Sequence, residues 1–151
     1  MSSATPAFKS ALYSACRTLF PEPAYVSYGH PGTVRRDDMV AVMNVTSEQE
    51  IATMSAQRRR EETLTVEVVF SYWGGGSDQQ IVTERAYAAL AMLENYLQDS
   101  GTIASAQITL GGTVRDCMVT GHFLEEADDP DLLATGRLAD ITATIRARVR
   151  I

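Results

Sequence analysis

The stretch that decides the fold is RRREETLTVEVVFSYWGGGSDQQ, residues 58–80. From residue 64 its apolar and polar side chains alternate, which is typical of a half-buried β-strand. The apolar members of this alternation are Leu64, Val66, Val68, Phe70 and Tyr72. Three glycines follow, and then Ser77 with Gln80 three residues later, a capping-box pattern that predicts the start of a helix. The stretch therefore predicts a strand, a glycine turn and a helix in succession.

Two helices are predicted on either side of this strand. Behind Ser77, apolar residues recur at helical spacing, and the helix is expected to run to about Gln98 and to end by Gly101. An earlier helix is expected to begin with Thr5 as its N-cap, followed by proline at the first helical position. Prolines at positions 21 and 23 end that helix, because proline cannot continue it.

Further strands are predicted at residues 24–29, 38–45, 105–112, 114–126 and 140–151. In the second of these, alternation places Met39, Ala41, Met43 and Val45 on one face. Gly111–Gly112 suits the positive φ angles of a tight hairpin turn between the third and fourth. In the last, apolar residues point to one side and threonines and arginines to the other. Residues 46–62 are polar without a clean period, so they are either a long loop or an extended strand arm.

The order helix, strands, helix, strands predicts a single α+β domain over residues 1–151. We expect a mixed, mostly antiparallel β-sheet with the two main helices packed on one face. A chain of 151 residues with 45% apolar residues is long enough to build one core.

The charge balance weighs against a nucleic-acid-binding protein. There are 13 basic and 19 acidic residues, which gives a net charge of −6, although a local basic patch remains compatible with this total. No signal-peptide pattern and no long apolar run is present, so we expect no membrane association and a soluble chain made in the cytosol. Cys16 and Cys117 lack metal-ligand spacing and are interpreted as reduced, buried thiols.

The sequence offers no clear catalytic, cofactor or metal site. Gly74, Gly75 and Gly76 precede a helix, where backbone amides attract anions, but the lysine of a phosphate-binding loop is absent. We therefore interpret them as a turn or a partner-contacting loop, with an anion-binding or enzymatic domain as the alternative. The acidic segment with Asp128, Asp129 and Asp131 lacks the glycine and closing glutamate of a calcium loop. The two histidines and the serines show no metal or nucleophile motif.

Two charged features remain open. Arg146, Arg148 and Arg150 line one face of the last strand. They are either a solvated face paired with carboxylates such as Glu67, or a basic stripe that faces an acidic partner or a passing nucleic acid backbone. The block of Arg58, Arg59, Arg60, Glu61 and Glu62 is either an exposed strand start or one side of a contact between subunits of a ring.

The order of these features resembles the tail terminator (tail completion) proteins of long-tailed bacteriophages. The resemblance lies in an N-terminal helix ending in prolines, then VSYGHPG, DDMVAVMNV and a long polar arm. The block RRREETLTVEVVFSYWGGGSDQQIVTERAYAALAMLENYL, a glycine-containing hairpin and the final alternating strand complete it. It covers nearly all of the chain, without any chemically specific motif.

The resemblance implies a small α/β fold that forms a homo-hexameric ring on the last ring of the tail tube. Such a ring stops tube polymerisation and presents a surface to the head–tail connector (stopper) protein, without catalysis or a cofactor. It implies location in the neck of the virion, with assembly in the host cytoplasm and DNA only passing through the lumen. Another neck component, such as a connector or a tube-like subunit, is the alternative.

Physical reasoning then assigns residues to these roles. The arginine–glutamate block 58–62, together with Arg146 and Arg148, is expected at subunit contacts. Gly74 to Ser77 and the acidic residues Asp128, Asp129 and Asp131 are expected to face the tube or the connector.

Overall fold

The computed structural model describes residues 3–34, 36–51, 59–76, 78–98 and 109–151. Its elements, in chain order, are α1 (Thr5–Leu19), β1 (Tyr25–Tyr28), β2 (Asp38–Ile51), β3 (Arg60–Gly75), α2 (Gln79–Gln98), β4 (Asp116–Glu126), α3 (Pro130–Leu133) and β5 (Gly136–Arg150). None of the described helices is both long enough and apolar enough to cross a membrane.

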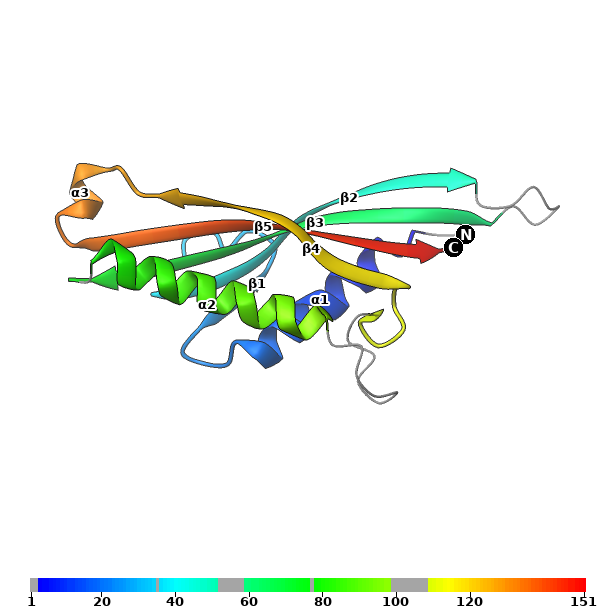
Figure 1. The fold of residues 1–151 in the computed structure, drawn as a ribbon, viewed down its shortest axis with the longest axis horizontal. Coiled ribbons are helices and arrows are strands. Elements are labelled where there is room, and N and C mark those ends of the chain that lie inside the picture. Colours follow the sequence, from blue (N-terminus) through cyan, green and yellow to red (C-terminus); the bar gives the residue numbers. More distant parts are fainter. Residues whose placement is uncertain (1–2, 35, 52–58, 77, 99–108) are drawn as a thin grey trace.

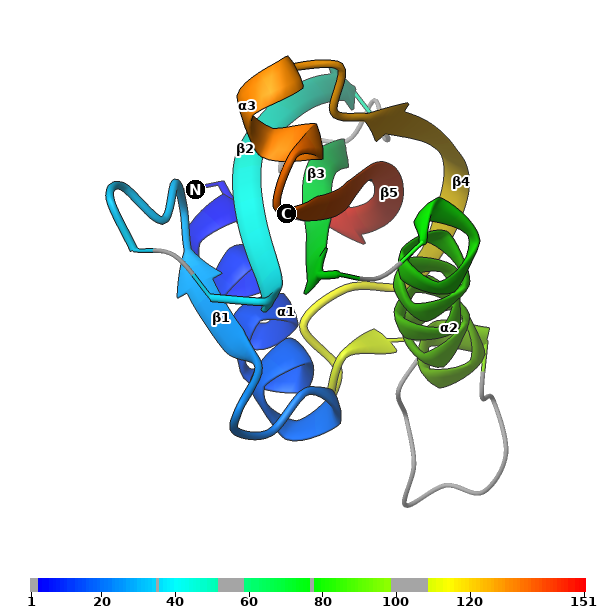
Figure 2. The same ribbon diagram turned by 90° about the vertical axis from the view of Figure 1, so that its left-hand side faces the viewer.

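The strands form one five-stranded sheet in the order β1-β2-β3-β5-β4. β1 pairs with β2 in parallel, and all other neighbours are antiparallel. α1 and α2 lie together on one side of the sheet, whereas the short α3 lies at one end on the other side (Figures 1 and 2). The predicted α+β class, with a mixed and mostly antiparallel sheet, is confirmed.

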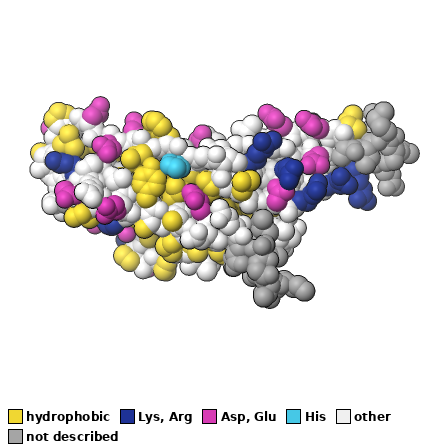
Figure 3. Space-filling view, viewed as in Figure 1, with side chains coloured by type: hydrophobic (Ala, Val, Ile, Leu, Met, Phe, Trp, Pro, Cys, Tyr) yellow, Lys and Arg dark blue, Asp and Glu magenta, His cyan; other side chains and the backbone are white. Residues whose placement is uncertain are grey.

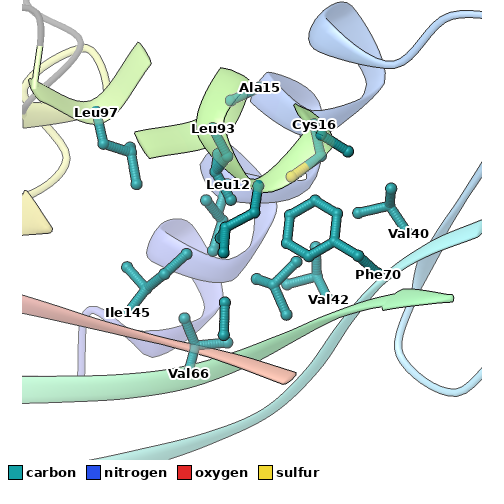
Figure 4. Packing of buried hydrophobic residues seen from close by; sticks show 14 of the residues in the cluster. Leu12, Ala15, Cys16, Val40, Val42, Val66, Phe70, Leu93, Leu97 and Ile145 are labelled. Carbon is teal, nitrogen blue, oxygen red and sulfur yellow. The ribbon is translucent and has the colours of Figure 1, made fainter. Parts of the chain in front are cut away.

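The hydrophobic core lies between the sheet and the two long helices (Figure 4). The alternation predicted in β3 and β5 is confirmed, because the apolar set of each strand is buried. The core members from these strands are Leu64, Val66, Val68, Phe70, Tyr72, Ala139, Ile141, Ala143, Ile145 and Ala147. α1 contributes Phe8, Leu12, Ala15 and Cys16, and α2 contributes Val82, Ala86, Ala89, Leu90, Leu93 and Leu97.

The predicted core face of β2 is wrong over its first half. Val40 and Val42 enter the core, whereas Met39 and Ala41 are buried on the opposite side of the strand. A register shift between Val42 and Val45 then returns Val45 to the core side. Because a β-bulge adds one residue to a strand, it inverts the alternation that a regular pattern would carry through.

Both predicted helix starts differ from the structure. α1 has Ala4 as its N-cap with no side-chain cap, and Thr5 is already helical. The backbone N–H of Thr5 instead donates to Oγ of Ser3 at 3.1 Å. At α2, Ser77 lies outside the described residues, and Oδ1 of Asp78 accepts a hydrogen bond from the backbone N–H of Ile81 at 3.0 Å. The aspartate therefore caps α2.

The strand predicted at residues 105–112 is wrong where the structure describes it, because residues 109–112 form a turn. Gly111 and Gly112 do adopt positive φ angles of 71° and 86°, as expected of a tight turn. Backbone N–H groups of Gly112 and Val114 both donate to the carbonyl of Thr109 at 3.1 Å. The turn leads into β4, and residues 105–108 and Gly101 lie outside the described part.

Where it is described, the polar segment 46–62 forms an arm of extended strand, which was one of its two predicted states. β2 continues to Ile51 and β3 begins at Arg60, with residues 52–58 outside the described part. β5 pairs with β3 as far as Glu61 opposite Arg150, so three strands reach the arm end of the sheet (Figure 1).

The two cysteines are free and buried, as predicted. Cys16 faces the core from α1, and Cys117 does so from β4. Burial raises the pKa of each thiol to about 12, and the charge of Asp116 adds to the rise at Cys117.

Candidate interaction surfaces

One face of the sheet carries neither α1 nor α2, and we call it the open face (Figure 2). It presents the alternate residues of β3 and β5 that do not enter the core. Their register is fixed by pairs such as Trp73 with Leu138, Ser71 with Asp140 and Thr65 with Arg146. The predicted functional residues lie near the two ends of the sheet. We call the end beside α3, where β3 ends and β5 begins, the α3 end, and the opposite end, where β3 begins and β5 ends, the arm end.

The arginine stripe of β5 lies on the open face near the arm end. Arg148 is paired with Asp116 of β4: Nη2 donates to Oδ2 at 2.6 Å, and Nε lies 3.2 Å from both carboxylate oxygens. This hydrogen bonding, and the charge of Asp116, raise the pKa of Arg148. The carboxylate partner is thus Asp116 and not Glu67, which lies opposite Thr144.

The other two arginines of the stripe are exposed and have no such partner in the part of the chain that the structure describes. Among the described residues, neither Arg146 nor Arg150 forms an ion pair or a side-chain hydrogen bond. Basic side chains gather at the arm end in Figure 3, whereas acidic side chains are spread along the whole length of the molecule. Within the stripe, Arg148 is therefore used in an ion pair inside the chain, whereas Arg146 and Arg150 are available to a partner.

The arginine–glutamate block lies beside this stripe, and much of it is engaged within the chain. Nη1 of Arg60 donates to Oε1 of Gln49 at 3.2 Å, and Oε2 of Glu61 lies 3.4 Å from Nη1 of Arg115. Arg59 is exposed, and Arg58 lies outside the described residues. Backbone bonds of 3.0 and 2.9 Å between Arg60 and Ile151 join the start of β3 to the chain end.

Glu62 does not belong to a surface contact, which corrects its predicted role. Its side chain is fully buried on the helix side of the sheet. Four donors converge on its carboxylate: the Ser3 hydroxyl at 2.6 Å, the Ala4 backbone N–H at 2.7 Å, the Ser47 hydroxyl at 2.5 Å and the Gln49 amide at 3.1 Å. Burial acts to raise the pKa of Glu62, but these hydrogen bonds outweigh it and hold the pKa below its usual value.

The three glycines do not form a loop. β3 continues through Gly74, which is buried and opposite Arg137, and through Gly75, which is opposite Gly136. Only Gly76 turns the chain, with a φ of 71°. Gly74 is therefore not a docking surface. The N–H of Gly76 donates to the carbonyl of Thr135 at 3.1 Å, so an anion bound at this amide would first have to displace that carbonyl.

The acidic residues after β4 are exposed, as a docking surface requires, and they flank α3. Oδ1 of Asp129 accepts from the N–H of Asp131 at 3.0 Å and so caps the short helix. Asp128 precedes it and Asp131 lies in its first turn. The bond between Gly76 and Thr135 places the end of β3 beside the residues that follow α3.

The structure thus gathers the predicted residues into two sets at opposite ends of the sheet (Figure 1). The described residues predicted to dock on the tube or connector lie at the α3 end, and those predicted at subunit contacts lie at the arm end, except that Gly74 and Glu62 are buried. Ser77 and Arg58 lie outside the described residues.

Sequence reasoning missed a hollow on the open face beside α3. It measures about 600 Å³ and is lined by Arg36, Asp37, Met39, Ser71, Trp73, Leu132, Leu138 and Asp140. The outward positions of Trp73 and Leu138 in their alternating strands were a usable signal, because large apolar side chains on a polar strand face mark a contact.

Comparisons with models of protein families and with curated proteins found no match for this chain. Its function is therefore argued from the order of its sequence features and from the geometry of the open face.

Proposed function

We propose that this chain is a structural protein of a phage neck, a tail terminator that forms a ring on the end of the tail tube. The ring stops tube polymerisation and provides the surface to which the head–tail connector binds. The supporting sequence observation is the order of helix, polar arm, strand, glycine turn and helix, which resembles that of tail terminators.

The observation that carries the proposal is the separation of two exposed polar surfaces at opposite ends of one sheet. A ring subunit needs surfaces for its neighbours and others for the structures above and below. The arm end offers Arg60, Glu61, Arg146 and Arg148 for subunit contacts. The α3 end offers Gly75, Gly76 and the acidic residues 128–131 for the tube or the connector. Both rely on shape and charge complementarity, and no catalytic step is proposed.

A homo-hexamer agrees with head-to-tail contacts that carry both signs of charge, because heterologous contacts close into rings when the rotation permits. DNA would only pass through the lumen, which agrees with the net charge of −6, since a strongly basic bore would retain it. The protein would act in the virion neck and assemble in the host cytoplasm.

The test is to add the purified protein to the polymerising tail tube protein of the same phage and to measure tube lengths by electron microscopy. We expect growth to stop, with an extra ring of density at one tube end. Unchanged tube lengths would refute a terminator. If the protein then bound the connector alone, the second candidate, another neck component, would be favoured, because the α3 end serves either role.

A further inference from the structure

The hollow beside α3 has a fixed aromatic wall. Trp73 pairs with Leu138 across the β3–β5 ladder, and its backbone N–H donates to the carbonyl of Asp37 at 2.7 Å. Its indole ring lies across Gly136: a Cβ added there would lie only 2.6 Å from Cζ2 of the ring and 2.4 Å from the Gly74 carbonyl oxygen. Because Gly136 has no side chain, the indole ring can occupy the space above it, and the ring lies half-buried at the edge of the hollow.

The hollow is also lined by a carboxylate with one buried oxygen that has no hydrogen-bond partner among the described residues. Oδ1 of Asp140 is buried and has no hydrogen-bond partner, the only such side-chain atom found among the described residues. Glu125 lies directly opposite Asp140 on β4, and Asp37 lines the same hollow. Arg36 is the one basic side chain among the lining residues. The lining thus has two carboxylates and one cation, with the carboxylate of Glu125 on the neighbouring strand, so the hollow has an excess of negative charge and an acceptor without a donor.

An arginine side chain meets both demands. Its planar guanidinium stacks on an indole face and donates to a carboxylate in the same plane, whereas its methylene groups pack on apolar walls such as Met39 and Leu138. A negatively charged ligand would be repelled, and a purely apolar ligand would leave Asp140 without a donor.

This chain itself presents a suitable arginine at the other end of the same strand. Arg150 is exposed, lies on the open face and forms no ion pair or side-chain hydrogen bond among the described residues. It is ten residues from Asp140 along β5, which is about 33 Å in an extended strand, so it cannot reach the hollow of its own chain. Arg148 is held by Asp116, and Arg146 lies further from the arm end.

We propose that the hollow binds Arg150 of a second copy of this chain, head to tail, with its guanidinium on Trp73 and hydrogen-bonded to Asp140. This proposal rests on the proposed function, because a ring requires self-association. Of the arginines in the stripe, it assigns Arg150 as the donor of this contact and Asp140 as its acceptor. Because the donor and the acceptor are different surfaces, the contact is heterologous and extends from subunit to subunit, as a ring needs.

Charge exchange tests this pairing, and Trp73, the only tryptophan of the chain, reports on it. Sedimentation and tryptophan emission are measured against protein concentration at fixed salt. For the wild type, we expect association accompanied by a change in emission. Asp140→Arg and Arg150→Asp should each weaken association by about tenfold or more, since like charges would then face each other. The two single variants should associate when mixed, and the double variant should associate alone, because both restore opposite charges.

Arg146→Asp is the comparison variant, since it also removes an exposed arginine from the open face at the arm end. It should weaken association less than Arg150→Asp does, and Asp140→Arg should not restore that loss. Circular dichroism checks each fold, and Asp140→Asn offers a milder change if Asp140→Arg fails to fold. Wild-type association in both single variants, or no recovery in the mixture, would overturn the pairing while leaving a ring in place. A wild type that stays monomeric at every concentration would also overturn the pairing. The proposed function would then be tested separately by the measurement of tube lengths. Emission that changes only with added tube protein would assign the hollow to that partner instead.

Discussion

The backbone N–H of Ala4 donates a hydrogen bond of 2.7 Å to Oε1 of Glu62, which joins the start of α1 to the start of β3 across 58 residues. The first turn of α1 contains no acidic residue and no side-chain cap. Glu62 therefore supplies, from a neighbouring strand, the negative charge that the N-terminus of a helix favours. Ser47 on β2 donates to the same carboxylate, so one buried side chain links α1, β2 and β3 at the base of the arm.

We expect Glu62→Gln to lower the free energy of unfolding by about 2–4 kcal/mol. Four donors face the carboxylate, and a glutamine offers them a single oxygen and adds two donors of its own. Urea unfolding of both proteins measures the difference. Glu61→Gln is the control on the adjacent residue, whose 3.4 Å ion pair with Arg115 is partly exposed and should contribute less than about 1 kcal/mol. Equal losses in the two variants would contradict this role of Glu62.

The contribution of Glu62 should depend on pH in one direction. Its pKa in the folded protein lies below the ordinary glutamate value of 4.5, so on acidification the unfolded chain takes up this proton first. Stability from Glu62 is then fully present above about pH 4.5 and is lost as the pH falls through the lower folded pKa. The difference in unfolding free energy between wild type and Glu62→Gln should therefore shrink below that pH. A difference that stays constant from pH 7 to pH 3 would exclude the ionised carboxylate as its source.

The limits of sequence reasoning in this chain follow from how far apart the interacting residues lie. β3 and β5 were predictable because every second residue faces the same core, so a period of two is visible locally. The inverted face of β2 was not, because the bulge between Val42 and Val45 is set by pairing with β3. The cap of α1 was also hidden, since its acceptor, Glu62, comes from a distant strand.

The candidate sites show the same division. The exposed arginines of β5 could be assigned to one face from their spacing alone. The engagement of Glu62 could not, because a charged residue beside three arginines has the pattern of a solvated surface. The outward positions of Trp73 and Leu138 pointed to a contact, but the full lining of the hollow could not be predicted because it comes from β2, β3, α3 and β5 together with residues 36–37.

Both cysteine thiols should be inert in the folded protein. Burial raises the pKa of Cys16 and of Cys117 to about 12, so at pH 8 only about one thiol in 10,000 is ionised. We expect a disulfide reagent such as dithionitrobenzoate to react with neither thiol at the rate of a free thiol until denaturant is added, when both react. Fast reaction of one thiol under native conditions would show that its element opens. Cys16→Ala and Cys117→Ala, each measured alone, would identify which.

Gly136→Ala should be strongly destabilising although it adds a single methyl group. The new Cβ would lie 2.4 Å from the Gly74 carbonyl oxygen and 2.6 Å from the Trp73 ring, so either the β3–β5 ladder or the indole must move. We expect a loss of about 2–3 kcal/mol in the free energy of unfolding, measured in urea. A shift of tryptophan emission toward that of an exposed indole should accompany it, since Trp73 is the only source.

Gly121→Ala is the matched control, because Gly121 is also a strand glycine and a Cβ there meets nothing within 4 Å. It should leave stability within about 0.5 kcal/mol or raise it slightly, since alanine restricts the unfolded chain more than glycine does. If Gly136→Ala instead matched this control in stability and in emission, the indole would not be seated on Gly136. The claim that Trp73 is held in place at the hollow would then be wrong, and so would the proposed stacking of Arg150 on its indole ring.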